Sequence, residues 1–326
     1  ERVTVAGLDG SGRKRWRAIP SVMQLRDGTI LAAYREGSDH WLTPDGVIQL
    51  CRSTDGGRTW NKPQTIVSAE GRNFGCHLRM AELNDGTILL PLVEFHSISG
   101  DPTYLQYYGR SHPAWPHPAG LNLHHLISTH VILSHDGGHT WTSPQQLDLG
   151  SHVIWTGSYG DVLVGPEGEI IMSVHWQQEG DTINCRSGLI RSRDGGHNWS
   201  HLTQIAYGVH DEKSVCMLPS GRMIAVMRNG DQPAKRSFSD DGGETWTPVE
   251  SLPFPGQSPC LLQTQSGVLL CSYRQRIPGR PQGVGLSYSY DEGETWGETD
   301  NLYVSPLRDC AYANLLEIST GEYIAV

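Results

Sequence analysis

The sequence predicts an all-β fold, a six-bladed β-propeller. Three observations predict it. The pattern Ser-x-Asp-x-Gly-x-Thr-Trp occurs five times, and six segments consist of an apolar strand, a glycine turn and a second apolar strand. The chain of 326 residues also contains 38 Gly and 19 Pro, which is typical of a protein with many turns. Repeats of this length with several short strands each are typical of propeller blades.

Each copy of the first pattern predicts a tight turn. An Asp such as Asp55 accepts hydrogen bonds from backbone N–H groups a few residues on, and the following Gly permits positive φ. Thr resumes a strand, and Trp packs a large ring beside it. We expect the five Asp residues to be structural, at the turns between the two outer strands of the blades, and the five Trp residues to be mostly buried. The copies are STDGGRTW (53–60), SHDGGHTW (134–141), SRDGGHNW (192–199), SDDGGETW (239–246) and SYDEGETW (289–296).

The second pattern places the blades in order. Its turn glycines are Gly28, Gly86, Gly168, Gly221, Gly267 and Gly321. We expect four-stranded antiparallel blades over about 16–62, 74–143, 153–201, 209–248 and 256–298, with a sixth at 309–326. Residues 1–10 alternate enough for one strand, which we expect to complete the last blade. No linker separates the blades, so residues 1–326 are predicted to form a single domain.

Blade two contains the longest insertion, at about 97–125. It is rich in Pro, His and aromatic residues and lacks periodicity. Long loops of this kind are often lids or binding loops. Its aromatic residues would suit stacking on a sugar ring, and the alternative is a loop that packs on itself.

Composition excludes several classes of protein. The net charge of −10 argues against a general nucleic-acid or anionic-membrane binder. No apolar run is long enough to span a membrane. The seven cysteines are odd in number and form no C-x-x-C pair, so neither a disulfide framework nor a zinc site is indicated. We expect no metal and no organic cofactor.

Two polar residues share one blade position. The inner strand of a blade lines the central channel, and it begins about nine or ten residues before the glycine turn. Counting nine back from Gly221 gives Glu212, and nine back from Gly321 gives Tyr312. Residues in equivalent positions of inner strands converge on the channel, so we expect these two to meet in one pocket.

The two patterns together resemble the sialidase (neuraminidase) superfamily, whose members are six-bladed propellers with such Asp boxes. HDEKSVCMLPSGRMIAVMR at 210–228 is similar to the family's Asn-Glu-Ser-x-x-x-x-Leu-x-x-Gly-Arg segment. CAYANLLEISTGEY at 310–323 resembles its Tyr-Ser-x-Leu segment, which ends in Gly. The resemblance implies that Tyr312 is a nucleophile, that Glu212 is its base and that Arg228 binds substrate. His210 and Asp211 depart from the family's pattern.

A tyrosine nucleophile has a chemical reason. Sialic acid carries a carboxylate on its anomeric carbon, which would repel Asp or Glu but not a neutral phenol. A phenol with a pKa of about 10 is weak until a neighbouring base takes its proton. Sialidases with a Tyr nucleophile are a recognised departure from the two-carboxylate glycosidase scheme.

The general acid is expected on the loop YREGSDHWLTPDG at 34–46. Family members place an Asp on a mobile loop before the first Asp box. Asp39 matches best by its distance from the first strand. Asp45 is the alternative, and its structural role would be a turn before Gly46.

The resemblance also implies three arginines that grip the substrate carboxylate, a role that suits the bidentate guanidinium. Arg228 is one, and Arg280 is favoured over Arg274 as the third. The first is displaced, because the family has Arg-Ile-Pro whereas this chain has Arg17-Ala18-Ile19-Pro20. A β-bulge near Trp16 would turn Arg17 toward the channel. Without it, Arg35 would substitute.

The predicted function is that of a retaining exo-α-sialidase-like glycoside hydrolase acting on terminal sialic acid. Its partners would be sialylated or other acidic glycans, and its expected location is secreted or periplasmic, although no signal peptide is visible in this chain. The oligomeric state stays open. One alternative is a glycosidase or lyase for another acidic sugar, such as a uronic acid. A second is a non-catalytic glycan-binding propeller. In the first alternative, acid or base roles would go to His40, His77, His175 or His210.

Overall fold

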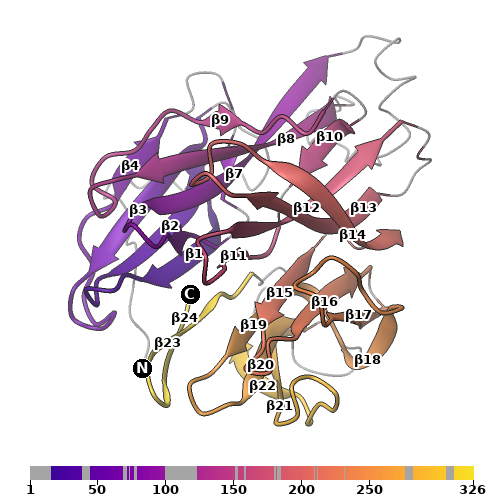
Figure 1. Cartoon of the computed structure of the whole chain (residues 1–326). Coiled ribbons are helices and arrows are strands. Elements are labelled where there is room, and N and C mark those ends of the chain that lie inside the picture. Colours follow the sequence, from indigo (N-terminus) through magenta and orange to yellow (C-terminus); the bar gives the residue numbers. More distant parts are fainter. Residues whose placement is uncertain are drawn as a thin grey trace.

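The structure is a computed structural model of the whole chain, shown in Figure 1. It describes residues 16–38, 45–68, 72, 74–76, 79–99, 123–150, 153–157, 159–179, 181, 185–208, 210, 212–230, 232–275, 282–305 and 312–326. These residues form antiparallel strands and no helix, in a β-propeller. The described part of the chain therefore contains no apolar helix of membrane-spanning length.

Five sheets of four or five strands are the blades, and they follow one another in sequence order. The first blade comprises β1 (Trp16–Gln24), β2 (Ile30–Gly37), β3 (Val47–Ser53) and β4 (Gln64–Val67). The second comprises β5 (Phe74–Gly75), β6 (Ala81–Glu82), β7 (Ile88–Ser99), β8 (Leu123–Ser134) and β9 (Gln145–Gln146). The third comprises β10 (Val153–Gly157), β11 (Val162–Val164), β12 (Ile170–Gln178), β13 (Cys185–Ser192) and β14 (Ser200–Gly208). The fourth comprises β15 (Lys213–Met217), β16 (Met223–Asn229), β17 (Gln232–Ser239) and β18 (Glu250–Pro255). The fifth comprises β19 (Gln257–Gln263), β20 (Leu269–Gln275), β21 (Gly283–Ser289) and β22 (Asp300–Val304).

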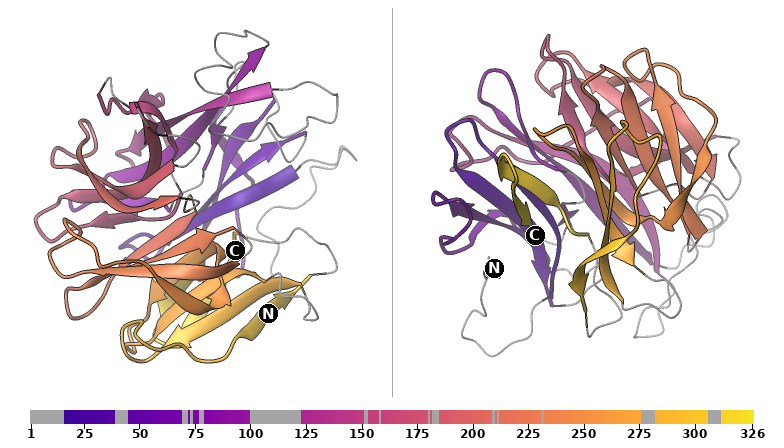
Figure 2. Two further views of the ribbon diagram at one scale, coloured as in Figure 1. Left: turned by 90° about the vertical axis from the view of Figure 1, so that its right-hand side faces the viewer. Right: turned by 90° about the horizontal axis from the view of Figure 1, so that it is seen from below.

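A two-stranded sheet, β23 (Leu315–Ser319) and β24 (Glu322–Ala325), lies between the first and fifth blades (Figure 2). Gly57 of the first blade packs against Ile324, and the Ser272 hydroxyl of the fifth blade donates to the Ala313 carbonyl at 2.9 Å. The prediction of an all-β propeller is therefore confirmed, with five blades. A complete sixth blade is not observed among the described residues, and residues 1–10, expected to complete it, lie outside them.

The glycine turns and Asp boxes have the predicted geometry. All six turn glycines have φ between 81° and 90°. In the first box, Asp55 accepts hydrogen bonds from the Thr59 amide at 2.9 Å, the Thr59 hydroxyl at 2.6 Å and the Ser53 hydroxyl at 2.8 Å. The Trp60 indole N–H donates to the Gly57 carbonyl at 3.0 Å. The other four boxes repeat these contacts between the two outer strands, so their Asp residues are occupied structurally.

The burial of the box tryptophans differs from the prediction. Trp199 is buried, with 7% of its surface exposed, and it packs with Leu89 and Ile170. The other four are only half-buried. The boxes lie at the outer rim, where solvent reaches part of these four rings.

Neighbouring blades are held by apolar clusters and by arginines at the rim. Leu31 and Ala33 of β2, for example, pack against Leu90 and Leu92 of β7. At the rim, an arginine of one blade donates to a glycine carbonyl in the next blade's Asp box. The pairs are Arg52 with Gly137 at 2.9 Å, Arg191 with Gly242 at 2.6 Å, and Arg236 with Gly293. These contacts continue the blade-to-blade packing outward.

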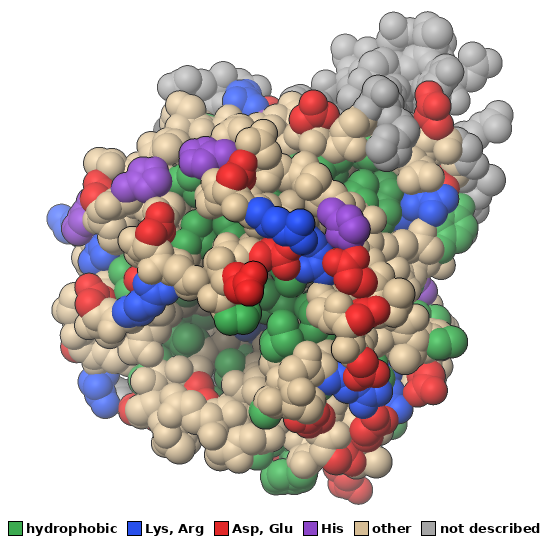
Figure 3. Space-filling model, in the orientation of Figure 1, with side chains coloured by type: hydrophobic (Ala, Val, Ile, Leu, Met, Phe, Trp, Pro, Cys, Tyr) green, Lys and Arg blue, Asp and Glu red, His purple; other side chains and the backbone are tan. Residues whose placement is uncertain are grey.

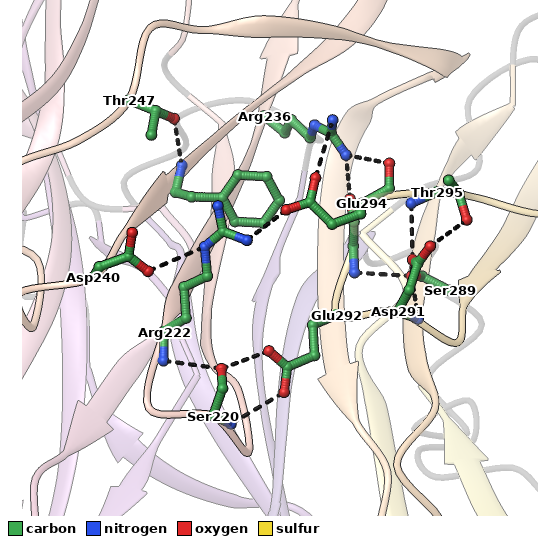
Figure 4. A network of polar contacts seen from close by, with 12 residues as sticks. Ser220, Arg222, Arg236, Asp240, Thr247, Ser289, Asp291, Glu292, Glu294 and Thr295 are labelled. Carbon is green, nitrogen blue, oxygen red and sulfur yellow. Dashed lines mark hydrogen bonds and ion pairs between the residues drawn. The ribbon is translucent and has the colours of Figure 1, made fainter.

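Figure 4 shows the rim between the fourth and fifth blades, where both signs of charge alternate. Arg222 pairs with Glu294 at 2.5 Å and with Asp240 at 3.3 Å, and its guanidinium lies 3.8 Å from the centre of the Phe238 ring. Glu292 of the fifth blade accepts the Ser220 amide at 3.0 Å. The same mixing of acidic and basic side chains is visible on the face drawn in Figure 3.

An arginine whose side chain is 19% exposed joins the sheets at the centre. The inner strands of the second and third blades are each split, as β5/β6 and β10/β11. Arg79, between β5 and β6, reaches the centre and pairs with Asp161 at 3.3 Å. It donates to the Leu261 carbonyl at 2.8 Å, to the Asn314 side chain at 3.2 Å and to the Cys260 sulfur.

Further hydrogen bonds extend this central network to the remaining blades. Asp161 accepts the Ser214 hydroxyl at 2.6 Å and the Val215 amide at 2.8 Å. Asn314 donates to the Pro20 carbonyl at 2.7 Å. The central network, which comprises Arg79, Asp161, Asn314 and these partners, therefore links all five blades to the β23–β24 sheet.

Replacing Arg79 should test this network. Arg79→Met leaves the Asp161 carboxylate buried, 5% exposed, without its cation. Breaking a buried pair in this way costs about 3–5 kcal/mol, so we expect that loss in the free energy of unfolding from urea titration. The control is Arg58→Met, which removes a surface pair with Glu322 and should cost about 0–1 kcal/mol. Equal losses in the two variants would contradict a central role for Arg79.

The Asp boxes should also make the stability of the fold depend on pH in the acidic range. Hydrogen bonds from Thr59, then from Ser53, lower the pKa of Asp55 from its usual 3.8 to about 2, and bonds from Asn198 lower that of Asp194 to about 2. The folded state then binds these protons less readily than the unfolded state, so their stabilisation is present above about pH 4 and lost as the pH falls toward 2. Melting temperatures measured from pH 6 to pH 2 should fall most steeply in that window. Asp194→Asn should flatten the fall, and an unchanged profile would contradict the linkage.

Candidate active site

Tyr312 and Glu212 meet at the centre of the molecule. Glu212 directly precedes β15, and Tyr312 lies three residues before β23. The Tyr312 hydroxyl donates to Glu212 Oε1 at 2.9 Å. Residues 100 positions apart in the chain are thus brought together, as their shared blade position predicted.

The Glu212 carboxylate is buried, 7% exposed, and both of its oxygens are occupied. Oε1 also contacts Arg228 Nη1 at 2.9 Å. Oε2 accepts the Ser258 amide at 2.7 Å and the Ser258 hydroxyl at 3.1 Å. Hydrogen bonds to both oxygens and a cation at one of them offset the cost of burying this charge.

Tyr312 has a strained backbone, with φ at +68°. The Asn314 side chain donates to the Tyr312 carbonyl at 3.3 Å and also belongs to the central network. A non-glycine residue in the left-handed region persists only when its surroundings over-determine it, and such residues concentrate at functional sites. The network beneath Tyr312 supplies that constraint.

The ring of Tyr312 contacts a cation and a second tyrosine. The Arg274 guanidinium is 5.3 Å from the centre of its ring, and the Tyr159 ring meets it edge-on at 5.7 Å. Burial raises the pKa of Tyr312 well above its usual value, the Glu212 charge raises it further, and Arg274 lowers it. The phenol therefore stays protonated until a base accepts its proton.

Three of the candidate arginines share a blade position, seven residues after their turn glycines: Arg35, Arg228 and Arg274. Arg228 and Arg274 contact the Tyr312–Glu212 pair. Arg35 is buried, 4% exposed, beside Cys76 of the second blade. Arg280, favoured over Arg274 on the sequence, lies outside the described residues.

Arg17 is paired within its own blade. Its Nε contacts Glu36 Oε2 at 2.7 Å, across the β1–β2 ladder. The predicted β-bulge is present, but it lies between Ala18 and Ser21 rather than near Trp16. Because the irregularity follows Arg17, it leaves Arg17 directly opposite Glu36 and Ala18 opposite Arg35.

The candidate acids and histidines are placed as follows. Asp39, His40 and His77 lie outside the described residues, as does most of the insertion. Asp45 accepts the Ser38 amide at 3.2 Å and the Ser38 hydroxyl at 2.9 Å. His210 Nδ1 is 2.8 Å from the Arg228 carbonyl oxygen. His175 packs tightly against Gly157, where a Cβ would lie 2.4 Å from the ring.

Sequence reasoning missed Ser258 and Tyr159, although a signal for both was present. Nine residues before Gly267 lies Ser258, and nine before Gly168 lies Tyr159, the same position as Glu212 and Tyr312. The same repeat spacing would have placed all four at the site. Among the described residues, no group of three or more His, Cys, Asp or Glu is arranged to hold a metal ion.

Comparison with curated proteins identifies sialidases as relatives. The chain is 26% identical over 332 residues to a sialidase of Bacteroides fragilis (strain YCH46), covering 95% of this chain and 59% of the relative. It is 28% identical over 360 residues to a sialidase of Micromonospora viridifaciens, covering 98% of this chain and 52% of the relative. The chain therefore spans between about half and three fifths of the length of these relatives.

Solved structures share the fold. A protein of unknown function from Dyadobacter fermentans DSM 18053 aligns with a TM-score of 0.79 at 22% identity, over 96% of this chain and 90% of its own. The Hadza microbial sialidase Hz136 aligns with a TM-score of 0.72 at 19% identity, over 93% of this chain and 61% of its own. The family model described as BNR repeat-like domain matches residues 115–325. The chain belongs to this BNR repeat-like family, within the sialidase/BNR propeller superfamily.

Proposed function

We propose that this chain is a retaining exo-glycosidase of sialidase type that removes terminal sialic acid from glycoconjugates, with Tyr312 as the nucleophile. The observation that carries the proposal is the 2.9 Å hydrogen bond from the Tyr312 hydroxyl to Glu212 Oε1, the oxygen that also contacts Arg228. A phenol that is hydrogen-bonded to a buried carboxylate is the arrangement that an activated tyrosine nucleophile needs. The sialidase relatives support the same reaction class.

The first half-reaction forms a covalent intermediate. Glu212 takes the phenolic proton as Tyr312 Oη attacks the anomeric carbon. The bond from that carbon to the glycosidic oxygen breaks, and the leaving oxygen takes a proton from Asp39, the acid proposed from the sequence.

The second half-reaction releases the sugar. A water gives a proton to the Asp39 carboxylate and attacks the anomeric carbon from the face that the leaving group occupied. The bond to Tyr312 Oη breaks, and Tyr312 recovers its proton from Glu212. Two displacements retain the configuration, and Tyr312, Glu212 and Asp39 all return to their starting protonation states.

The substrate carboxylate would bind Arg228 and Arg274. These are the described cations that contact the Tyr312–Glu212 pair. The guanidinium attracts an anionic sugar, and the neutral phenol beside it adds no negative charge that would repel that sugar. We therefore assign Arg274 the role for which Arg280 was first favoured.

The pairing of Arg17 favours a second candidate function, hydrolysis or elimination on another acidic sugar such as a uronic acid. Ala18 occupies the place of the family's first arginine, and Arg17 contacts Glu36. A site with fewer cations would bind an anomeric carboxylate less tightly. A propeller that binds glycans without catalysis is the remaining candidate, and it predicts binding with no turnover of any glycoside.

We also propose that the chain is one domain whose sixth blade is built on β23–β24 and completed by the strand expected at residues 1–10. A groove lined by Gly57, Trp60, Ile318 and Ile324 lies beside β24. A further strand paired with β24 would cover it.

Removing the nucleophile tests the reaction. Tyr312→Phe deletes the attacking oxygen and keeps the ring between Arg274 and Tyr159. We expect kcat/KM on a fluorogenic sialoside to fall by more than about a hundredfold, with an unchanged melting temperature. Tyr207→Phe, at an exposed tyrosine of the third blade, is the control and should be fully active. A fully active Tyr312→Phe variant would exclude Tyr312 as the nucleophile.

Replacing Arg274 and Arg17 in turn tests which arginines bind the substrate carboxylate. Arg274→Ala should weaken binding of the sialoside about tenfold or more, because a hydrogen-bonded contact between ions contributes about 1.5–3 kcal/mol. Arg17→Ala should have a smaller effect, since Glu36 already holds its Nε. KM and inhibition constants for both variants check this. Equal losses would place Arg17 in the site, and faster turnover of a glucuronide or galacturonide by the unmodified chain would favour the second candidate function.

A further inference from the structure

Ser258 contacts Glu212, Tyr159 lies against Tyr312, and neither has a role in the reaction described above. They share the blade position of Glu212 and Tyr312, nine residues before a turn glycine. Both are buried, Ser258 with 1% and Tyr159 with 7% of its surface exposed. Four of the six equivalent positions in the repeat therefore meet at one place.

Ser258 is shaped to hold one oxygen of the carboxylate. The β19–β20 register shifts between Gln257 and Cys260, and Ser258 has φ at +53°. A bulge re-aims backbone and side chain. Here both the amide and the hydroxyl of Ser258 reach Glu212 Oε2, at 2.7 and 3.1 Å. The oxygen that faces Tyr312 and Arg228 is the other one, Oε1.

Tyr159 extends this contact by one hydroxyl. The Tyr159 and Tyr312 side chains both lie within hydrogen-bonding reach of the Ser258 side chain, and burial raises the pKa of Tyr159 well above the usual value, so Tyr159 keeps its proton. Each hydroxyl has one proton to donate. Since Ser258 donates to Glu212, Tyr159 donates to Ser258. The direction of the chain is therefore Tyr159 to Ser258 to Glu212 Oε2.

We propose that Ser258 and Tyr159 are positioning residues that fix the plane of the Glu212 carboxylate, so that Oε1 stays aimed at the Tyr312 hydroxyl. The torsion that turns a carboxylate is soft, so one oxygen must be anchored to keep the other in place. The inference rests on the proposed function, because it assigns an effect on proton transfer from Tyr312. Neither residue is assigned a contact with substrate.

The experiment measures kcat and KM separately on the fluorogenic sialoside. Ser258→Ala keeps the hydrogen bond from the backbone amide to Glu212 Oε2 and loses the hydrogen bond from the hydroxyl. We expect kcat to fall about tenfold or more, with KM within about twofold, because proton transfer and not binding depends on the carboxylate plane. Tyr159→Phe keeps the ring edge against Tyr312 and should lower kcat less.

The double variant gives a readout that a merely structural role would not move. If Tyr159 acts through Ser258, Tyr159→Phe should cause no further loss of kcat in the Ser258→Ala background. The matched control is Ser287→Ala, which removes another buried serine hydroxyl of the fifth blade, 3.2 Å from the Tyr273 hydroxyl and without a contact to Glu212. It should leave kcat unchanged.

The outcomes separate this inference from the proposed function. Tyr312→Phe and Glu212→Gln are run beside these variants. If both are inactive while Ser258→Ala keeps the wild-type kcat, the positioning role is overturned and the proposed function stands. An additive loss in the double variant, or an equal loss in Ser287→Ala, also overturns it. If Tyr312→Phe is fully active, both proposals fall. If Ser258→Ala does not fold, the kcat of Tyr159→Phe is compared with that of Tyr273→Phe as the control. A kcat loss in Tyr159→Phe alone supports the positioning role, and equal values overturn it.

Discussion

The ion pair of Arg79 with Asp161 is the contact on which the centre of the molecule depends. A propeller has no single core, because its apolar clusters lie between successive blades. Where the inner strands end, backbone carbonyls and amides must find partners away from water. Arg79, in the second blade, donates to the fifth blade and to the last sheet and pairs with Asp161 of the third, and Asp161 accepts from the fourth. The pair is therefore satisfied on both sides, which makes a buried charge tolerable.

The candidate site stands on this network. Asn314 accepts from Arg79, donates to Pro20 of the first blade and donates to the carbonyl of Tyr312. The strained backbone of Tyr312 is thus held by the same contacts that hold the sheets together. In the proposed reaction, a side chain fixed in this way would meet the substrate with little conformational freedom left to lose. Stability at the centre and geometry at the site are consequences of one set of hydrogen bonds.

The two ends of the repeat have different roles, a structural one at the rim and a site-forming one at the channel. At the rim, the polar groups of every Asp box form hydrogen bonds within the box and with the neighbouring blade. The box carboxylates are therefore occupied by structural hydrogen bonds. At the channel, the position nine residues before the turn glycine is not occupied by one residue type. It is Tyr159, Glu212 and Ser258 in three blades, and Tyr312 before the β23–β24 sheet. Because the backbone delivers that position to the centre each time, different side chains there combine into one site.

Local chemistry explains what the sequence by itself determined. The Asp boxes and the glycine turns involve hydrogen bonds over about two to four residues, so their pattern predicts their geometry. The spacing of those turns then predicted the all-β propeller and the meeting of Glu212 with Tyr312. Contacts between residues far apart in the chain were beyond such reasoning. The pairing of Arg17 with Glu36, the half-burial of four box tryptophans and the reach of Arg79 to Leu261 depend on how blades pack. Only the tertiary structure decides these, because side chains from different blades meet at distances that no local pattern sets.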